Sequence, residues 1–118
     1  MPEIDIRAKM KYTFLMATSK EFINYFTETL SQVEGIGYRA MMGEYVLYYH
    51  GKVIGGIYDN RVLVKDIPSA RKILPEARLE LPYDGAKLML YLEDFENCGL
   101  VKELFDAMYE ELPARKSK

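Results

Sequence analysis

The chain has 118 residues, a formal net charge of -2 and a sequence pI near 5.5. Hydrophobic residues make up 49% of it and charged residues 29%, which fits a single globular domain that buries a core of its own. Proteins that bind nucleic acids by neutralising phosphates usually carry a basic excess. This charge balance therefore argues against nucleic acid as a direct ligand.

Cysteine content and hydropathy indicate where the protein resides. Cys98 is the only cysteine, which excludes an intramolecular disulfide and suits a reducing compartment. The N-terminal segment is charged and its apolar run is short, so no secretory signal is evident. No stretch approaches the roughly 20 apolar residues that cross a bilayer. We expect a cytoplasmic protein without a membrane segment.

The chain divides into three parts by its periodicity. Residues 1–17 show neither a helical nor a strand period and are predicted to form an N-terminal arm. Residues 18–113 carry the periodic elements and are predicted to form one domain. Residues 114–118 are charged and are predicted to be a solvated tail.

A first helix is predicted to begin at Thr18. With Thr18 as the N-cap, Glu21 falls at the third helical position and completes a capping box. Gly35 and Gly37 are expected to end this helix, because glycine tolerates the left-handed conformation common at helix ends. The apolar positions recur at helical spacing and form one stripe: Phe22, Ile23, Phe26, Leu30 and Val33.

The segment 38–65 is predicted to form three antiparallel strands. His50-Gly51 and Asp59-Asn60 suit two-residue hairpin turns, since Gly, Asn and Asp accept positive φ. These turns place Tyr48 opposite Val53, Val46 opposite Gly55, Ile57 opposite Val62 and Gly55 opposite Val64. The resulting core face holds Val46, Tyr48, Val53, Ile57, Val62 and Val64.

The opposite face of this sheet is predicted to be mixed and aromatic. It collects Tyr45, Leu47, Ile54, Tyr58 and Leu63, with Arg61 and Lys65 at its border. Gly55 and Gly56 lack side chains and would allow close approach of a ring or of another backbone. The composition of this face is that of a protein interface, and the alternative is that another part of the chain covers it.

Two further strands and two helices complete the prediction. Asp66 is expected to cap a short helix that Pro75 ends, and residues 79–83 and 87–92 are expected to pair around an Asp84-Gly85 turn. Asn97 is expected to cap a final helix that Pro113 ends. The order is α-β(3)-α-β(2)-α, an α+β fold with helices packed on an antiparallel sheet. The apolar stripe of the last helix is Leu100, Val101, Leu104, Phe105, Met108 and Leu112.

No catalytic or metal-binding set stands out, so we expect neither enzymatic activity nor a cofactor. His50 is the only histidine and falls at a hairpin tip, where an exposed turn residue is the simpler interpretation. Cys98 lies in the first turn of the last helix, where the helix dipole could activate a thiol, but no histidine lies near it in sequence. The acidic residues Glu93, Asp94 and Glu96 precede that helix, and favourable charge at its N-terminus accounts for them better than a cation site does.

A family resemblance emerges from the central segment. The pattern R39-x-M41-x-G43-x-Y45-x-L47-Y48, followed by a glycine turn and a strand ending in L63-V64-K65, resembles the N-terminal domain of the TfoX (Sxy) competence-regulator family. The similarity covers about residues 16–112. Met41-Met42-Gly43-Glu44-Tyr45 departs from the Met-Phe-Gly-Gly-Tyr usual in the family, and Gly55-Gly56 replaces bulkier residues.

The resemblance implies a fold similar to that of type III secretion chaperones, which often dimerise. It also implies a role in transcription regulation, where full-length members act with the cyclic-AMP receptor protein and carry a second, C-terminal domain. The stand-alone domain has no established biochemical activity.

We therefore expect a non-enzymatic protein-interaction module of regulatory type, forming a homodimer or binding a protein partner. The candidate surface is Arg39, Tyr45, Leu47, Tyr58, Arg61 and Leu63. Two alternatives remain open: a small-ligand sensor with Met41, Met42 and Tyr45 around a pocket, and a weak DNA-binding regulator with Arg39, Arg61 and Lys65 on phosphates.

Overall fold

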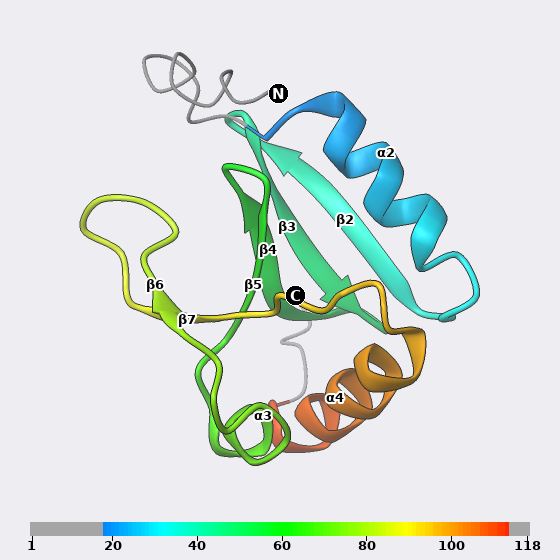
Figure 1. Cartoon of the computed structure of the whole chain (residues 1–118), viewed down its shortest axis with the longest axis vertical. Coiled ribbons are helices and arrows are strands. Elements are labelled where there is room, and N and C mark those ends of the chain that lie inside the picture. Colours follow the sequence, from blue (N-terminus) through cyan, green and yellow to red (C-terminus); the bar gives the residue numbers. More distant parts are fainter. Residues whose placement is uncertain (1–17, 114–118) are drawn as a thin grey trace.

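The computed structural model describes residues 18–113, which form an antiparallel sheet with helices packed against it (Figure 1). This confirms the predicted α+β class. The predicted arm, residues 1–17, and the predicted tail, residues 114–118, lie outside the described range. In chain order the elements are α2 (Lys20–Thr29), β2 (Ile36–Met41), β3 (Glu44–Tyr49), β4 (Lys52–Tyr58), β5 (Arg61–Val64), α3 (Pro68–Ile73), β6 (Leu79–Glu80), β7 (Met89–Tyr91) and α4 (Cys98–Glu111).

The sheet has six strands where five were predicted, in the order β2-β3-β4-β5-β7-β6. The additional strand is β2, which pairs with β3 through a two-residue turn at Met42 and Gly43. Both turn residues have positive φ, 50° and 87°. The predicted turns at His50-Gly51 and Asp59-Asn60 are confirmed, and all four of these residues also have positive φ. Strands β2 to β5 thus form a continuous meander.

A β-bulge changes the predicted register between β3 and β4. Tyr48 lies opposite Val53, as predicted, but Leu47 lies opposite Gly55 and Val46 opposite Gly56. Ile54 is therefore an extra residue on β4 with no partner across the ladder. Because side chains alternate between faces, the extra residue on β4 places Val46, Tyr48 and Val53 on the face opposite Ile57. The predicted core face, which held all four, is therefore wrong for these three residues. The predicted pairing of Val46 with Gly55 was wrong for this reason.

The helices cover one face of the sheet, and the core lies between them. Leu47, Tyr49, Ile57, Val62 and Val64 share a buried cluster with residues of all three helices. The helix residues in that cluster include Ile23, Phe26, Ala70, Val101, Leu104, Phe105 and Met108. In Figure 1, α2 runs alongside β2, while α3 and α4 lie together at the other end of the sheet.

Helix α2 begins one residue later than predicted and ends earlier. Its N-cap is Ser19, whose hydroxyl accepts a hydrogen bond from the Phe22 N–H at 3.0 Å. Thr18 is buried instead, and its hydroxyl donates to Glu44 at 2.9 Å, so the predicted capping box is absent. The helix ends at Thr29, well before Gly35, which has φ +97° in the following turn.

Helix α4 is closest to its prediction. Asn97 caps it by accepting from the Leu100 N–H at 3.1 Å, and the predicted apolar stripe is buried except for the half-buried Leu100. At the other end, the Lys52 ammonium donates to the carbonyls of Tyr109 and Leu112, both at 2.9 Å. A cation at this position satisfies free carbonyls and complements the helix dipole.

The segment between β5 and α4 differs in detail from the prediction. Helix α3 has Ile67 as its N-cap and Pro68 at its first position, while Asp66 pairs with Arg71 at 2.5 Å. Strands β6 and β7 are shorter than predicted and are joined by a long loop that contains the Asp84-Gly85 turn. In the range 18–113, no helix combines the length and hydropathy needed to cross a bilayer.

Candidate functional site

The face of the sheet opposite the helices carries the candidate site. Cross-strand pairing places six residues on it, to which we refer as the open face: Arg39, Met41, Val46, Tyr48, Val53 and Tyr58. Arg39, Met41 and Val53 are exposed, and the other three are partly exposed. Methionine, tyrosine and arginine are enriched at protein interfaces, so this face also has an interface-like composition, although of the residues predicted for it only Tyr58 is among these six.

The bulge redistributes the residues predicted for the interaction surface. Leu47 lies on the helix-covered face and is 0% exposed, as part of the core. Tyr45 lies on the same side, partly buried, with its ring 5.4 Å from that of Tyr38. Leu63 lies on the open side but is also 0% exposed. The two leucines therefore cannot present a contact surface in this conformation.

The remaining predicted residues lie on the open side of the sheet. Arg39 is exposed on the edge strand β2. Arg61 pairs with Glu80 at 2.8 Å and donates to the Tyr58 carbonyl at 3.1 Å, so its charge is already neutralised. Lys65 follows the end of β5. The three cations proposed for DNA contact therefore do not form one unpaired basic group, because Arg61 is paired.

Gly56 determines how Tyr58 lies on the open face. A Cβ at Gly56 would meet the Tyr58 ring and hydroxyl at 2.6 Å, so the ring lies directly over the glycine. On the other side, the Tyr58 ring is 6.0 Å from that of Tyr83 in the β6–β7 loop. The close approach of an aromatic ring at the glycine pair is confirmed. Burial raises the pKa of Tyr58, with further contributions from Tyr83 and Glu44.

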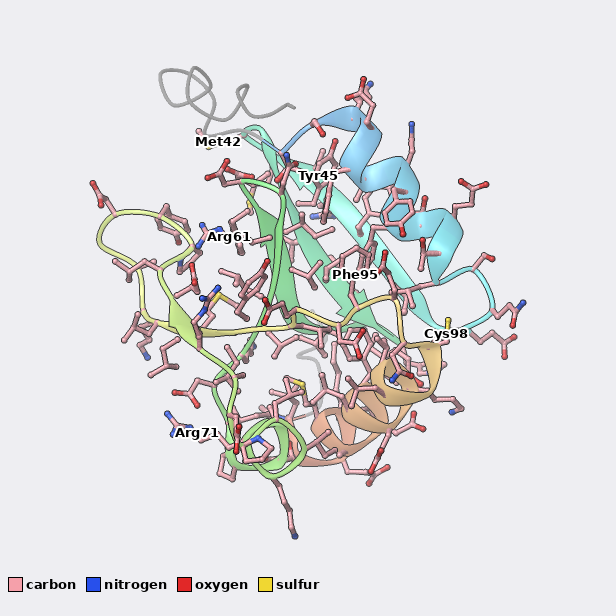
Figure 2. The ribbon with its side chains drawn as sticks, viewed as in Figure 1. Met42, Tyr45, Arg61, Arg71, Phe95 and Cys98 are labelled. Atoms are coloured by element: carbon pink, nitrogen blue, oxygen red, sulfur yellow. The ribbon has the colours of Figure 1, made fainter. Side chains whose placement is uncertain are left out.

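A hollow lies beside this tyrosine pair, at the tip of the β2–β3 hairpin. It has a volume of about 400 Å³ and is lined mainly by Met41, Met42, Tyr45, Tyr58 and Tyr83. Met42 is 97% exposed, and Figure 2 places it at the hairpin tip. All three residues that the sequence grouped around a ligand pocket line this hollow, although the Tyr45 ring lies on the helix-covered side of the sheet, against Tyr38. Tyr83 was missed, because it lies far along the chain and carries no motif.

Tyr49 provides a polar contact within the helix-covered face. Its hydroxyl donates to Asp106 at 2.6 Å, and its ring packs 5.4 Å from Phe105. Burial, together with this hydrogen bond, raises the pKa of Tyr49 to about 12. Hydrogen bonds from Lys102 and then from Tyr49 lower the pKa of Asp106. The contact joins β3 to α4.

This contact predicts a pH dependence of stability at alkaline pH. The pKa of Tyr49 is about 10 in the unfolded chain and about 12 in the folded one. The contribution of Tyr49 to stability is therefore complete below about pH 10 and is lost as the pH rises through about 12. Tyr49→Phe should cost about 1 kcal/mol at neutral pH, and this difference from the wild-type chain should vanish in the alkaline window.

Urea unfolding of both chains across this pH range measures the difference. Tyr48→Phe is the matched control, since the Tyr48 hydroxyl makes no hydrogen bond with residues 18–113, and it should differ little from wild type throughout. A wild-type advantage over Tyr49→Phe that is unchanged at every pH would contradict the assignment.

His50, Cys98 and Glu96 each make a contact within the domain. His50 is exposed at the β3–β4 turn, with its ring 4.4 Å from Tyr49. The Cys98 thiol donates to the Thr29 carbonyl at 3.4 Å, and Figure 2 shows it at the start of α4. Glu96 accepts a hydrogen bond from the Tyr25 hydroxyl. Within the described residues, no group of three or more His, Cys, Asp or Glu side chains is placed to hold a metal ion.

Residues 18–113 thus define an α+β domain whose antiparallel sheet carries helices on one face and an aromatic, methionine-containing surface on the other. No protein-family model matches the chain, and no solved structure matches it. It is similar to the "Uncharacterized 12.7 kDa protein in trpE 5'region" of Spirochaeta aurantia, with 29% identity over 104 residues. The similarity spans 87% of this chain and 90% of that protein.

Proposed function

We propose that this protein is a non-enzymatic, cytoplasmic protein-interaction module of regulatory type, and that its open face is the contact surface. One observation carries the proposal: within residues 18–113 the helices pack on one face of the sheet and leave apolar side chains exposed on the other. Met41 is 50% exposed and Val53 is 36% exposed. Such residues on a sheet face, rimmed by an arginine, match the composition of protein interfaces.

The resemblance to the N-terminal domain of competence regulators supports the regulatory part of the proposal. Of the residues that carry this resemblance, some are exposed and others are buried in the core. Arg39 and Met41 are exposed on the open face, whereas Leu47 is buried in the core. The core residue preserves the sheet, and the exposed residues are available to a partner.

A second copy of this chain is the partner to test first. We expect a dimer in solution by light scattering, and we expect Met41→Asp or Val53→Asp to shift it to monomer, because a carboxylate in an apolar interface is desolvated without a partner. Circular dichroism should remain unchanged, since both side chains are exposed. Leu79→Asp is the matched control, because Leu79 is 43% exposed but lies on β6, away from the open face.

Two outcomes would contradict the dimer. The wild-type chain could remain a monomer at high micromolar concentration, or Leu79→Asp could dissociate the dimer as strongly as Met41→Asp does. In either case the open face would not be the contact between copies of the chain.

A small-ligand sensor is the second candidate function, favoured by the 400 Å³ hollow at Met41, Met42 and Tyr45. Its volume lies within the range of small-molecule sites. A thermal-shift screen in which no metabolite class raises the melting temperature would count against it.

A further inference from the structure

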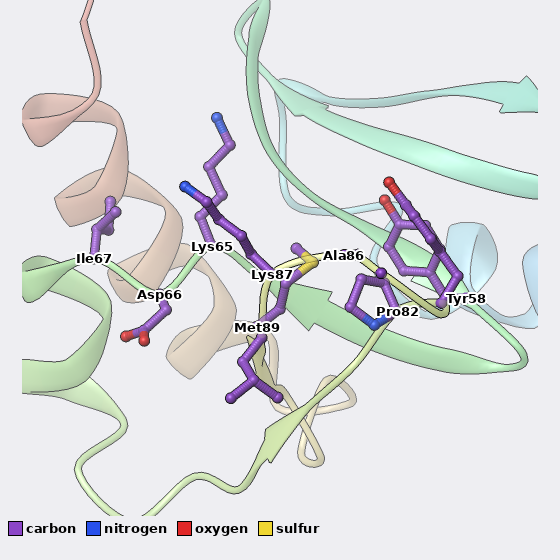
Figure 3. A pocket seen from close by; sticks show the side chains of 11 residues that line it. Tyr58, Lys65, Asp66, Ile67, Pro82, Ala86, Lys87 and Met89 are labelled. Carbon is purple, nitrogen blue, oxygen red and sulfur yellow. The ribbon is translucent and has the colours of Figure 1, made fainter.

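A second and larger hollow lies on the far side of the Tyr58–Tyr83 pair, between β5 and the β6–β7 loop. Its volume is about 840 Å³, which is within the range of ligand sites in proteins. The residues that decide its chemistry are Tyr58, Lys65, Asp66, Tyr83, Lys87 and Met89. Figure 3 labels all of these except Tyr83 around the hollow; they come from β4, the β5–α3 connection, the β6–β7 loop and the start of β7.

The hollow carries two cations without a counter-charge. Lys65 and Lys87 both line it, and Figure 3 shows their side chains extending in the same direction. Neither ammonium group makes a hydrogen bond or an ion pair with any residue in the range 18–113. Two neighbouring positive charges repel each other, and an anion between them relieves that repulsion while gaining charge-assisted hydrogen bonds.

The one acidic residue that lines the hollow is already committed elsewhere. Both oxygens of Asp66 accept from the Arg71 guanidinium, at 2.5 and 2.8 Å. This bidentate contact lowers the pKa of Asp66 and compensates its charge. Asp84 lies in the loop between Tyr83 and Gly85 but does not line the hollow, and Glu80 pairs with Arg61 and Arg78 at 2.8 and 3.6 Å. The two lysines therefore dominate the charge of the hollow.

The wall of the hollow is aromatic. The rings of Tyr58 and Tyr83 meet edge to face, 6.0 Å apart, and Pro82 is buried beside them. Tyr83 is 61% exposed, so its ring is available to another flat group. Aromatic surfaces favour stacked or edge-to-face contacts with a second ring.

We propose that this hollow binds a small organic anion, with a phosphate or carboxylate between Lys65 and Lys87 and a flat apolar part against Tyr58 and Tyr83. The site goes beyond the proposed protein-interaction function and does not need the open face to be an interface. Its parts come from segments far apart in sequence, which the fold brings together.

Phenyl phosphate tests this site by isothermal titration calorimetry with the full chain at low ionic strength. It combines the two features that the hollow recognises, and we expect a dissociation constant on the order of 100 µM. Inorganic phosphate and phenol each supply one of those features and should bind more weakly. Benzoate distinguishes the two anion types, because a carboxylate site would bind it at least as tightly as phenyl phosphate.

Variants identify the residues involved. Lys65→Met and Lys87→Met remove one charge and keep the side-chain stem, and each should weaken phenyl phosphate binding about fivefold. Lys72→Met is the matched control, because Lys72 is exposed on α3 and does not line the hollow, and it should leave the affinity unchanged. Tyr83→Ala should weaken phenyl phosphate more than inorganic phosphate.

The proposal would be overturned by either of two results. One is the absence of saturable binding by both phenyl phosphate and benzoate. The other is binding that Lys65→Met and Lys87→Met weaken no more than Lys72→Met does. Equal affinity for inorganic phosphate and phenyl phosphate would overturn the aromatic part of the assignment.

Discussion

Replacing Gly55 with alanine should lower the free energy of unfolding by about 3 kcal/mol. A Cβ at Gly55 would lie 2.1 Å from the Leu63 carbonyl oxygen and 2.8 Å from the Val64 Cα. Both atoms belong to the backbone of β5 and cannot rotate away, so the two strands would have to separate. Urea unfolding followed by circular dichroism measures the loss.

Gly37→Ala is the control for this substitution. Gly37 also lies in a strand of the same sheet, but a Cβ there would meet no atom within 4 Å. Its replacement should change stability by no more than about 0.5 kcal/mol. If the two alanine variants lose the same stability, then β4 and β5 do not approach each other at Gly55 as closely as the structure shows.

Leu47→Arg should leave the chain largely unfolded at room temperature. Leu47 is 0% exposed and packs in the cluster between the sheet and the helices. An arginine at this position loses the apolar contacts and buries a charge without a counter-ion, which costs several kcal/mol. That cost is comparable to the whole stability of a typical domain, about 5–15 kcal/mol. Loss of far-UV circular dichroism and of amide dispersion in NMR spectra would report the unfolding.

Val53→Arg is the control for Leu47→Arg, because it places the same side chain on the opposite face of the sheet. Val53 lies on β4, adjacent to β3, but is 36% exposed on the open face of the single chain, where an arginine can remain in water when the protein is diluted to the monomer. We expect this variant to fold with a stability within about 0.5 kcal/mol of wild type. A folded Leu47→Arg together with an unfolded Val53→Arg would reverse the assignment of the faces.

The sequence was informative where local chemistry decides the conformation. The turns at His50-Gly51 and Asp59-Asn60 and the cap at Asn97 were predicted because few residues accept positive φ or satisfy free N–H groups at a helix start. Strand β2 was missed because its turn places a methionine, Met42, at positive φ. A methionine gives no signal for that conformation.

The bulge at Ile54 explains why the faces of β3 were exchanged. The bulge interrupts the alternation of faces along β4 at Ile54. Its neighbour Val53 is also apolar, so the hydrophobic pattern fits the register with or without the extra residue. Leu47 was therefore assigned to the interaction surface, although it is a core residue. The grouping of Met41 and Met42 with Tyr45 survived, because these residues are close in sequence. Lys65, Tyr83 and Lys87 line one hollow only after β5 and β7 pair, and no local sequence pattern predicts that arrangement.

The meander from β2 to β5 has a consequence for the order of folding. Each of its strands pairs with the next along the chain through a two-residue turn, so closing each loop costs little conformational entropy. In contrast, β7 pairs with β5, from which it is separated along the chain by α3, β6 and the long β6–β7 loop. We infer that the meander assembles first in the folding transition state, and that the hollow beneath the β6–β7 loop is among the last parts of the molecule to form.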